Sequence, residues 1–266
     1  MLFVTTDASM WPKALPRNGL IVLPRLVKRS QEEFAFQEAG HRQGLVLLPL
    51  TIGDFLRAWR VLKKGDDIVA IHAYTRFEQT ALQAKAAARL LRPGVGAAVF
   101  EALSHHSVRQ IVDVLLHYRH VLTVESAAMI VRQIQIETAS WILLPRDAAR
   151  GPWWRRLLTR FHDLEWRTLD YQTGVDHVVP GSDLLSNMYQ QTASGSVNVF
   201  VTGYPSAAPA GKVISEIKEW PHVRFMEITQ LQVRYPHIPT LAIIEFLPSR
   251  ERVEAIVRNA PGVHLG

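Results

Sequence analysis

The residues best suited to chemistry lie in the stretch 167–179, RTLDYQTGVDHVV. Arg167 and Asp170 are three positions apart, and Gly174 and Asp176 follow within a predicted β-hairpin. A guanidinium can donate two parallel hydrogen bonds to guanine O6 and N7 or to a phosphate, and can stack on the base. A carboxylate can accept from the guanine N–H groups. These four residues could bind one guanine nucleotide, and an exposed ion pair is the other interpretation.

A second group of candidate binding residues lies upstream, in a predicted helix over 151–164. Trp153, Trp154, Arg155 and Arg156 are consecutive there. Two adjacent tryptophans on a helix cannot both face one core, so one of them could contact a partner protein, with the arginine pair beside it. A contact between domains would explain the same pattern.

The rest of the chain suggests no catalytic group, and we expect neither an enzyme nor a metal site. There is no cysteine, which excludes disulfides, thiolate nucleophiles and cysteine-based zinc sites. The adjacent Asp66 and Asp67 precede a predicted strand, at the edge opposite the usual active face, and are expected in a solvated turn. The adjacent His105 and His106 should diverge at a helix start, which argues against a metal site.

Composition predicts a folded, cytoplasmic protein. Of the 266 residues, 48% are hydrophobic and 20% are charged, which is typical of a globular chain. The formal net charge of +6 suits anionic partners such as nucleotides, nucleic acid or a membrane surface. The first residues lack the pattern of a signal peptide, and no apolar run approaches the ~18 residues of a membrane span.

The first half of the chain alternates predicted strands and helices. The strands are expected at 19–24, 44–50, 67–74, 95–103 and 120–126, and the helices at 30–43, 51–65, 76–94, 106–119 and 127–139. Five β–α repeats predict a doubly wound parallel sheet of flavodoxin-like type in a domain over 1–138.

The second half, 139–266, changes rhythm and predicts an α+β, ferredoxin-like sheet with a hairpin. Its strands are expected at 140–145, 167–179, 197–205, 223–230 and 240–246, and its helices at 151–164, 181–193, 210–220 and 249–260.

The first half is similar to a bacterial receiver domain, most clearly in HVLTVESAAMIVRQI. That resemblance implies an acceptor aspartate after the third strand, acidic residues after the first and a lysine after the fifth. This sequence has His72-Ala73-Tyr74, Leu23-Pro24 and Glu125-Ser126 there. The resemblance therefore implies a receiver-like domain that cannot be phosphorylated.

The second half resembles the GGDEF fold of diguanylate cyclases. Gly174-Val175-Asp176-His177-Val178 takes the place of the signature, and Arg167 to Asp170 that of the upstream inhibitory motif, two residues closer than usual. Val175 and His177 break the signature, so the resemblance implies binding of cyclic di-GMP without synthesis. The two halves together resemble the cellulose synthesis protein E family. They imply a catalytically inactive regulator or scaffold of cellulose secretion, with a protein partner or a homodimer and no cofactor.

Two alternatives remain open. Residues 197–266 resemble an RNA-recognition module, with Phe200 and Phe246 where such modules have aromatic rings, but Leu241 and Ile243 replace rings that would stack on bases. The stretch from DIVAIHAY to AARLLRPG resembles part of a two-domain sugar-nucleotide enzyme, which would make the protein glycosyltransferase-like.

Overall fold

The computed structural model describes residues 1–11, 17–28, 34–37, 45–145, 164–171, 173, 175–192, 197–204, 206–231, 233–234 and 241–263. The chain divides into two compact units. Unit 1 comprises Met1–Ile134 and Arg250–Gly266, and unit 2 comprises Gln135–Ser249.

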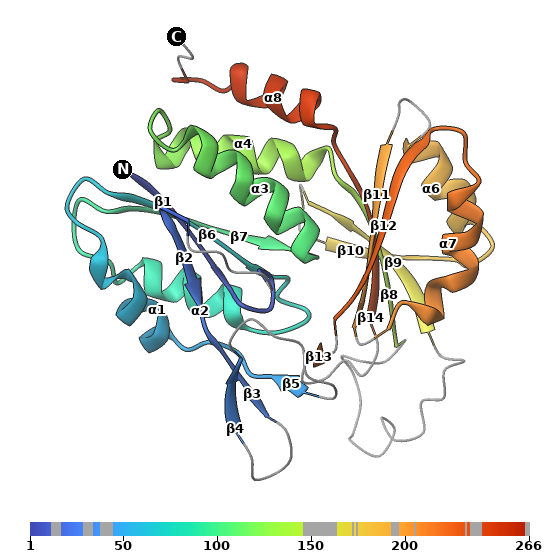
Figure 1. The fold of residues 1–266 in the computed structure, drawn as a ribbon, viewed down its shortest axis with the longest axis horizontal. Coiled ribbons are helices and arrows are strands. Elements are labelled where there is room, and N and C mark those ends of the chain that lie inside the picture. Colours follow the sequence, from blue (N-terminus) through green and yellow to red (C-terminus); the bar gives the residue numbers. More distant parts are fainter. Residues whose placement is uncertain are drawn as a thin grey trace. The chain divides into compact units, whose positions relative to one another are not determined.

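Unit 1 is built on a four-stranded parallel sheet in the order β2-β1-β6-β7 (Figure 1). The strands are β1 (Leu2–Asp7), β2 (Leu20–Leu23), β6 (Asp67–Ala73) and β7 (Gly96–Ala102). The sequence predicted β2, β6 and β7 correctly and did not indicate β1, which lies between β2 and β6. An α/β class with a parallel sheet is therefore confirmed.

Helices cover both faces of this sheet. On one face, α1 (Ile52–Ala58), the 3-10 turn η1 (Trp59–Val61) and α2 (Thr80–Ala88) pack Phe55, Trp59 and alanines against the strands. Thr51 begins α1 as predicted, because its side chain and that of Asp54 cap each other's backbone N–H. On the other face lies α3 (His105–Tyr118), with α4 (Val124–Ile136) and α8 (Arg250–Arg258) beside it (Figure 1).

The predicted helix over 30–43 is wrong. Its middle forms β4 (Phe34–Gln37), which pairs antiparallel with β3 (Arg25–Lys28). β3 also pairs antiparallel with β5 (Leu45–Leu47), the shorter counterpart of the strand predicted at 44–50. The alternation Phe-Ala-Phe has the period of a strand, and two aromatic residues favour extended backbone more than the flanking glutamates favour a helix.

The predicted fifth strand at 120–126 is also wrong, because α4 begins at Val124 inside it. Thr123 Oγ1 accepts a hydrogen bond from the Ser126 N–H, and Ser126 Oγ accepts one from the Thr123 N–H. This reciprocal cap starts a helix despite the β-branched residues Val121, Thr123 and Val124 around it. The parallel sheet therefore has four strands, without the fifth strand that a receiver requires.

Unit 2 is a mixed six-stranded sheet in the order β10-β9-β8-β14-β11-β12. All neighbours are antiparallel except β11 and β12. The strands are β8 (Ala139–Pro145), β9 (Leu164–Asp170), β10 (Val175–Val179), β11 (Val197–Tyr204), β12 (Val223–Gln230) and β14 (Leu241–Leu247), and a two-residue strand β13 (Val233–Arg234) lies between the last two in sequence. The predicted hairpin is β9 and β10.

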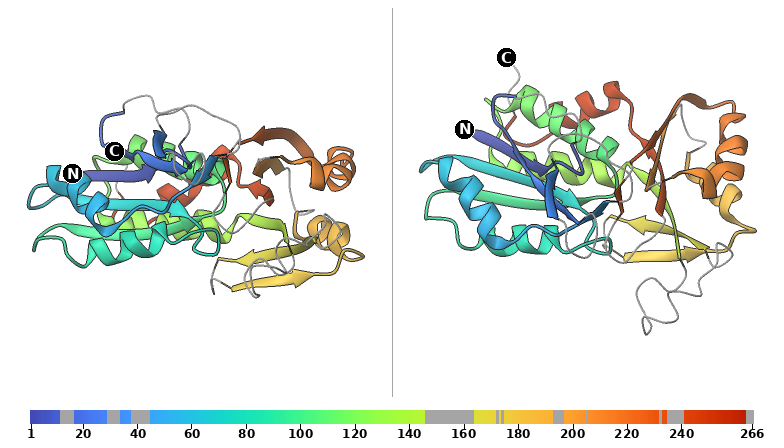
Figure 2. Two further views of the ribbon diagram at one scale, coloured as in Figure 1. Left: turned by 90° about the horizontal axis from the view of Figure 1, so that it is seen from below. Right: turned by 60° about the horizontal axis from the view of Figure 1, so that its bottom comes forward.

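Two helices cover one face of the unit 2 sheet, α6 (Leu184–Thr192) and α7 (Gly211–Lys218), the latter preceded by the 3-10 turn η2 (Ala208–Ala210). Figure 2 shows the sheet and its helical layer from two further sides. The core between them contains Trp141, Met188, Ile217 and Phe246. At Gly203 a Cβ would lie 2.1 Å from the Ala207 backbone nitrogen, so only glycine fits where β11 turns toward η2.

Candidate ligand-binding edge

The hairpin residues singled out in the sequence do not form one guanine site. Arg167 Nε lies 2.6 Å from Glu165 Oε1, and Arg167 Nη1 lies 3.4 Å from Asp176 Oδ2. Arg167 and Asp170, three apart on β9, point to opposite faces of the sheet because strand side chains alternate. Asp170 accepts instead from Thr173 Oγ1 at 2.8 Å. The structure thus brings Arg167 to Asp176 and leaves Asp170 on the other face.

Five predicted site residues fall outside the described part of the chain. Gly174 is one, and the others are Trp153, Trp154, Arg155 and Arg156, together with the helix predicted around them.

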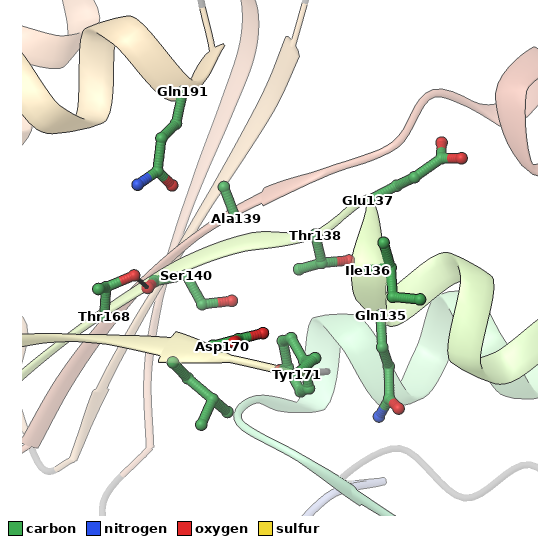
Figure 3. Close-up of a pocket in the computed structure, with 11 residues that line it drawn as sticks. Gln135, Ile136, Glu137, Thr138, Ala139, Ser140, Thr168, Asp170, Tyr171 and Gln191 are labelled. Atoms are coloured by element: carbon green, nitrogen blue, oxygen red, sulfur yellow. Dashed lines mark hydrogen bonds between the residues drawn. The ribbon is translucent and has the colours of Figure 1, made fainter. Parts of the chain in front are cut away.

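Asp170 lines a cavity of about 590 Å³ within unit 2 (Figure 3). The lining comprises Gln135, Ile136, Glu137, Thr138, Ala139, Ser140, Thr168, Leu169, Asp170, Tyr171 and Gln191. Two members are acidic and none is basic, so a phosphate-bearing nucleotide would meet like charge there. Arg167 is not part of this lining.

The carboxyl edge of the unit 1 sheet is the stronger candidate. In the order β2-β1-β6-β7, the chain continues from β1 to β2 on one side of it, and later adds β6 on its other side. Parallel sheets bind ligands outside the carboxyl ends of two strands at such a switch point. Asp7 ends β1, and His72 lies next to the end of β6. Both side chains are fully buried.

Asp7 is held by partners from three parts of unit 1. Its Oδ2 lies 2.9 Å from His72 Nδ1, and its Oδ1 accepts from the Ser9 N–H at 3.0 Å and from the Ser9 hydroxyl. Arg25 Nη1 lies 3.8 Å from Asp7 Oδ1. The aspartate is therefore fixed from the turn after β1, from β6 and from β3.

Arg25, at the start of β3, is fully buried and reaches across to the N-terminus of α2. Its Nη1 donates to Glu78 Oε1 at 2.9 Å and to Thr80 Oγ1 at 2.7 Å, and its Nη2 donates to Glu78 Oε2. Guanidinium and carboxylate thus meet through two parallel hydrogen bonds, the strongest geometry for such a pair.

The two carboxylates beside Arg25 differ in their electrostatics. Burial alone would raise the pKa of Asp7, but Arg25, His72 and Ser9 together hold it well below its ordinary value. Burial raises the pKa of Glu78, and the nearby Asp7 charge adds to that effect, against the lowering by Arg25. Asp7 is therefore the permanent anion and can only accept hydrogen bonds, so His72 carries its proton on Nδ1.

Two further loops meet the same edge. In the turn after β6, the Thr75 N–H donates to Glu101 Oε2 at 2.8 Å, and Lys85 Nζ lies 2.7 Å from Glu101 Oε1. Although burial alone would raise the pKa of Glu101, these hydrogen bonds lower it. After β7, Ser104 caps the 14-residue helix α3, whose positive dipole end lies at this edge.

The two histidines at the start of α3 do not diverge as predicted. Their ring centroids lie 3.8 Å apart, and both residues are buried. Burial, with the Arg109 charge, lowers the pKa of His106 to about 4, so this ring is neutral at pH 7. Across the described ranges, no three potential metal ligands gather. Asp66 lies in the expected turn and accepts from the Lys63 N–H at 2.7 Å.

Sequence reasoning missed Asp7, Arg25, His72 and Glu78. A usable signal existed for two of them, because Asp7 follows the apolar-rich LFVTT and His72 interrupts DIVAIHAY. A charged or polar residue at the end of a parallel strand indicates a ligand edge. The partners Arg25 and Glu78 carry no comparable local signal.

No family model matches the chain, and a search of curated proteins gives no match. Solved structures do match over nearly the whole chain. A Thermus thermophilus DegV family protein, described by its fatty acid binding, is 15% identical with a TM-score of 0.63, covering 93% of this chain and 99% of its own. Bacillus subtilis DegV, described as a fatty acid binding protein, is 14% identical with a TM-score of 0.62 at the same coverage. The Streptococcus pneumoniae fatty acid kinase B3 protein, loaded with linoleic acid, is 12% identical with a TM-score of 0.61.

These likenesses establish the fold and correct the earlier interpretation. The structures that this chain matches in fold are DegV family proteins and not a receiver-like and GGDEF-like pair. The resemblance to the cellulose synthesis protein E family is therefore wrong, as are the cyclic di-GMP and cellulose secretion roles drawn from it. The RNA-recognition alternative also loses its support, because Phe246 is buried in the core and presents no ring for stacking. Nothing in these likenesses points to a glycosyltransferase.

Proposed function

We propose that the protein binds a long-chain fatty acid non-covalently and carries it without catalysing a reaction. The observation that carries this proposal is the fold match, which spans 92–94% of this chain in eight structures. Several of those structures are described as fatty acid binding or contain a fatty acid. Sequence identity of 10–15% leaves this chain's own side chains to decide the ligand.

The carboxyl edge of unit 1 supports a ligand with an anionic head. It combines the positive end of α3 with the guanidinium of Arg25, which is paired with Asp7 and Glu78, and the ammonium group of Lys85, which is paired with Glu101. A carboxylate is favoured near such groups, because low-dielectric surroundings strengthen charge-assisted hydrogen bonds. Ser9, Thr75 and Ser104 add hydroxyl groups at the same edge.

Fluorescence titration tests the proposal. The protein, purified and stripped of lipid, is titrated with cis-parinaric acid, and native mass spectrometry of the unstripped protein identifies any acyl chain that copurifies. We expect saturable binding of one acyl chain per protein molecule. Emission that rises without saturation, together with a mass spectrum of the bare chain, would reject the proposal.

The proposed partner is an enzyme that phosphorylates the carboxylate of the carried fatty acid. Support comes from the pneumococcal structure, which is described as a protein of a fatty acid kinase. The test combines the loaded protein, ATP and a purified kinase of this type, and follows acyl phosphate formation.

Nowhere in the described part of the chain is a helix long and apolar enough to cross a membrane.

A further inference from the structure

Arg25 lies between two carboxylates, although one would balance its charge. Asp7 supplies that charge from β1, and Glu78 occupies the face of the guanidinium that offers two parallel hydrogen bonds. We propose that Arg25 is the carboxylate-recognition residue of the fatty-acid site, and that Glu78 is a built-in competitor that the ligand displaces. This inference rests on the proposed function and adds how the site recognises and regulates its ligand.

The geometry of the pair is the first argument. A fatty-acid carboxylate and a glutamate carboxylate are the same chemical group, so each can accept two hydrogen bonds from one guanidinium. The Arg25 fork is already pre-formed, since Thr80 Oγ1 accepts from the same Nη1 at 2.7 Å. A ligand carboxylate that replaced Glu78 would find both donors aligned.

The second argument is the difference between the two carboxylates. Asp7 is the last residue of β1 and is fixed by His72 and Ser9. Glu78 lies between β6 and α2, in a segment that belongs to neither element. Moving Glu78 costs no strand or helix hydrogen bond, whereas moving Asp7 disrupts the end of β1. The exchangeable carboxylate is therefore Glu78.

The third argument is the charge of the cluster. The titratable groups that meet here are Asp7 from β1, Arg25 from β3, His72 from β6 and Glu78 from the segment before α2. With Asp7 ionised and paired with Arg25, a second buried negative charge is in excess, and burial raises the pKa of Glu78. A ligand anion that enters therefore favours proton uptake by the displaced Glu78.

The test compares a fatty acid with its methyl ester, which keeps the chain but removes the charge. Wild type and Glu78→Gln are titrated with cis-parinaric acid and with its methyl ester. We expect Glu78→Gln to bind the acid roughly tenfold more tightly, because a neutral amide competes less well for a guanidinium. Affinity for the ester should stay unchanged. Arg25→Met should abolish the preference for acid over ester.

Arg25→Met could fail to fold, so a second measurement does not depend on that variant. Calorimetric titration in two buffers of different ionisation enthalpy measures proton uptake on binding. Proton uptake by wild type that is absent from Glu78→Gln supports the replacement of Glu78 by the ligand carboxylate. Glu165→Gln is the matched control, since Glu165 is a buried glutamate on Arg167 in unit 2. It should change neither affinity nor proton uptake.

Each outcome decides between the two proposals. Acid and ester binding with equal affinity to wild type and Glu78→Gln, without proton uptake, would overturn the role of Arg25 and leave acyl-chain binding intact. Binding of the acid by Glu78→Gln alone would support a competitor that excludes ligand from wild type. Failure of both proteins to bind acid or ester would overturn the fatty-acid function itself.

Discussion

Each unit of this protein places one arginine between two carboxylates, and the two arrangements differ in origin and burial. Arg167 meets Glu165 and Asp176 from its own hairpin, two and nine positions away, and its side chain is 17% exposed. Arg25 meets Asp7 and Glu78, which are 18 and 53 positions away, and all three side chains are buried.

The comparison shows that the same residue types contribute differently to stability according to how deeply they are buried. The Arg167 side chain is 17% exposed and those of Glu165 and Asp176 are 9% and 12% exposed, so water still reaches these ion pairs and partly screens them, and they should contribute about 1 kcal/mol. A fully buried cluster has lost its hydration, so each charge depends on its partners. The hairpin arrangement is easy to see in the sequence and energetically minor, whereas the cluster at the carboxyl edge is hidden in the sequence and energetically demanding.

The largest expected effect is that of Arg25→Met on stability. Removal of the guanidinium leaves two buried carboxylates without their cation, which should lower the free energy of unfolding by about 3–5 kcal/mol. Arg167→Met is the matched variant and should lower it by about 1 kcal/mol or less. Urea denaturation at pH 7 measures both, and equal losses would contradict the comparison.

The next effect is the acid sensitivity of the Asp7 position. The folded-state pKa of Asp7 lies below its ordinary value, so its stabilisation is present above about pH 4 and is lost as the pH falls further. Asp7→Asn should cost roughly 2–3 kcal/mol at pH 7 and flatten the acid limb of the stability curve. Unfolding free energies from pH 7 to pH 2 check this. A variant curve parallel to that of wild type would show that Asp7 does not titrate in this way.

The contribution of Glu78 to the free energy of unfolding should depend on pH in the opposite direction. Its folded-state pKa is raised, so its contribution is present at low pH and is lost as the pH rises above its ordinary value. Glu78→Gln should therefore stabilise the protein at pH 7 by on the order of 1 kcal/mol, and the difference should vanish near pH 4. Thermal unfolding at both pH values measures it. A variant less stable than wild type at pH 7 would mean that the Arg25 pair outweighs burial.

The smallest effect is expected in the hairpin. Asp176→Asn removes a charge 3.4 Å from Arg167, which keeps Glu165 as its closer partner. We expect a loss of under about 1 kcal/mol in unfolding free energy and no change in cis-parinaric acid affinity. A clear loss of affinity would move the ligand site toward unit 2.

The sequence by itself determined most elements whose signal is local. The alternation in the β9–β10 hairpin, the apolar runs of β6 and β11, and the Thr51 cap of α1 each act within a few residues. Where a local signal was ambiguous, prediction failed. The apolar and β-branched residues 121–124 resembled a strand, yet a reciprocal cap starts α4 there. The charged residues around Phe34–Gln37 suggested a helix, yet this segment forms the strand β4.

Only the tertiary structure decided the candidate site. The parallel order β2-β1-β6-β7 brings Asp7 and His72 to one edge, although 65 positions separate them, and β3 brings Arg25 to Glu78. No periodicity or spacing encodes these meetings, because strand order and burial arise from the packing of the whole unit. Burial then sets the chemistry, since it raises the pKa of Glu78 while the partners of Asp7 lower the pKa of that carboxyl.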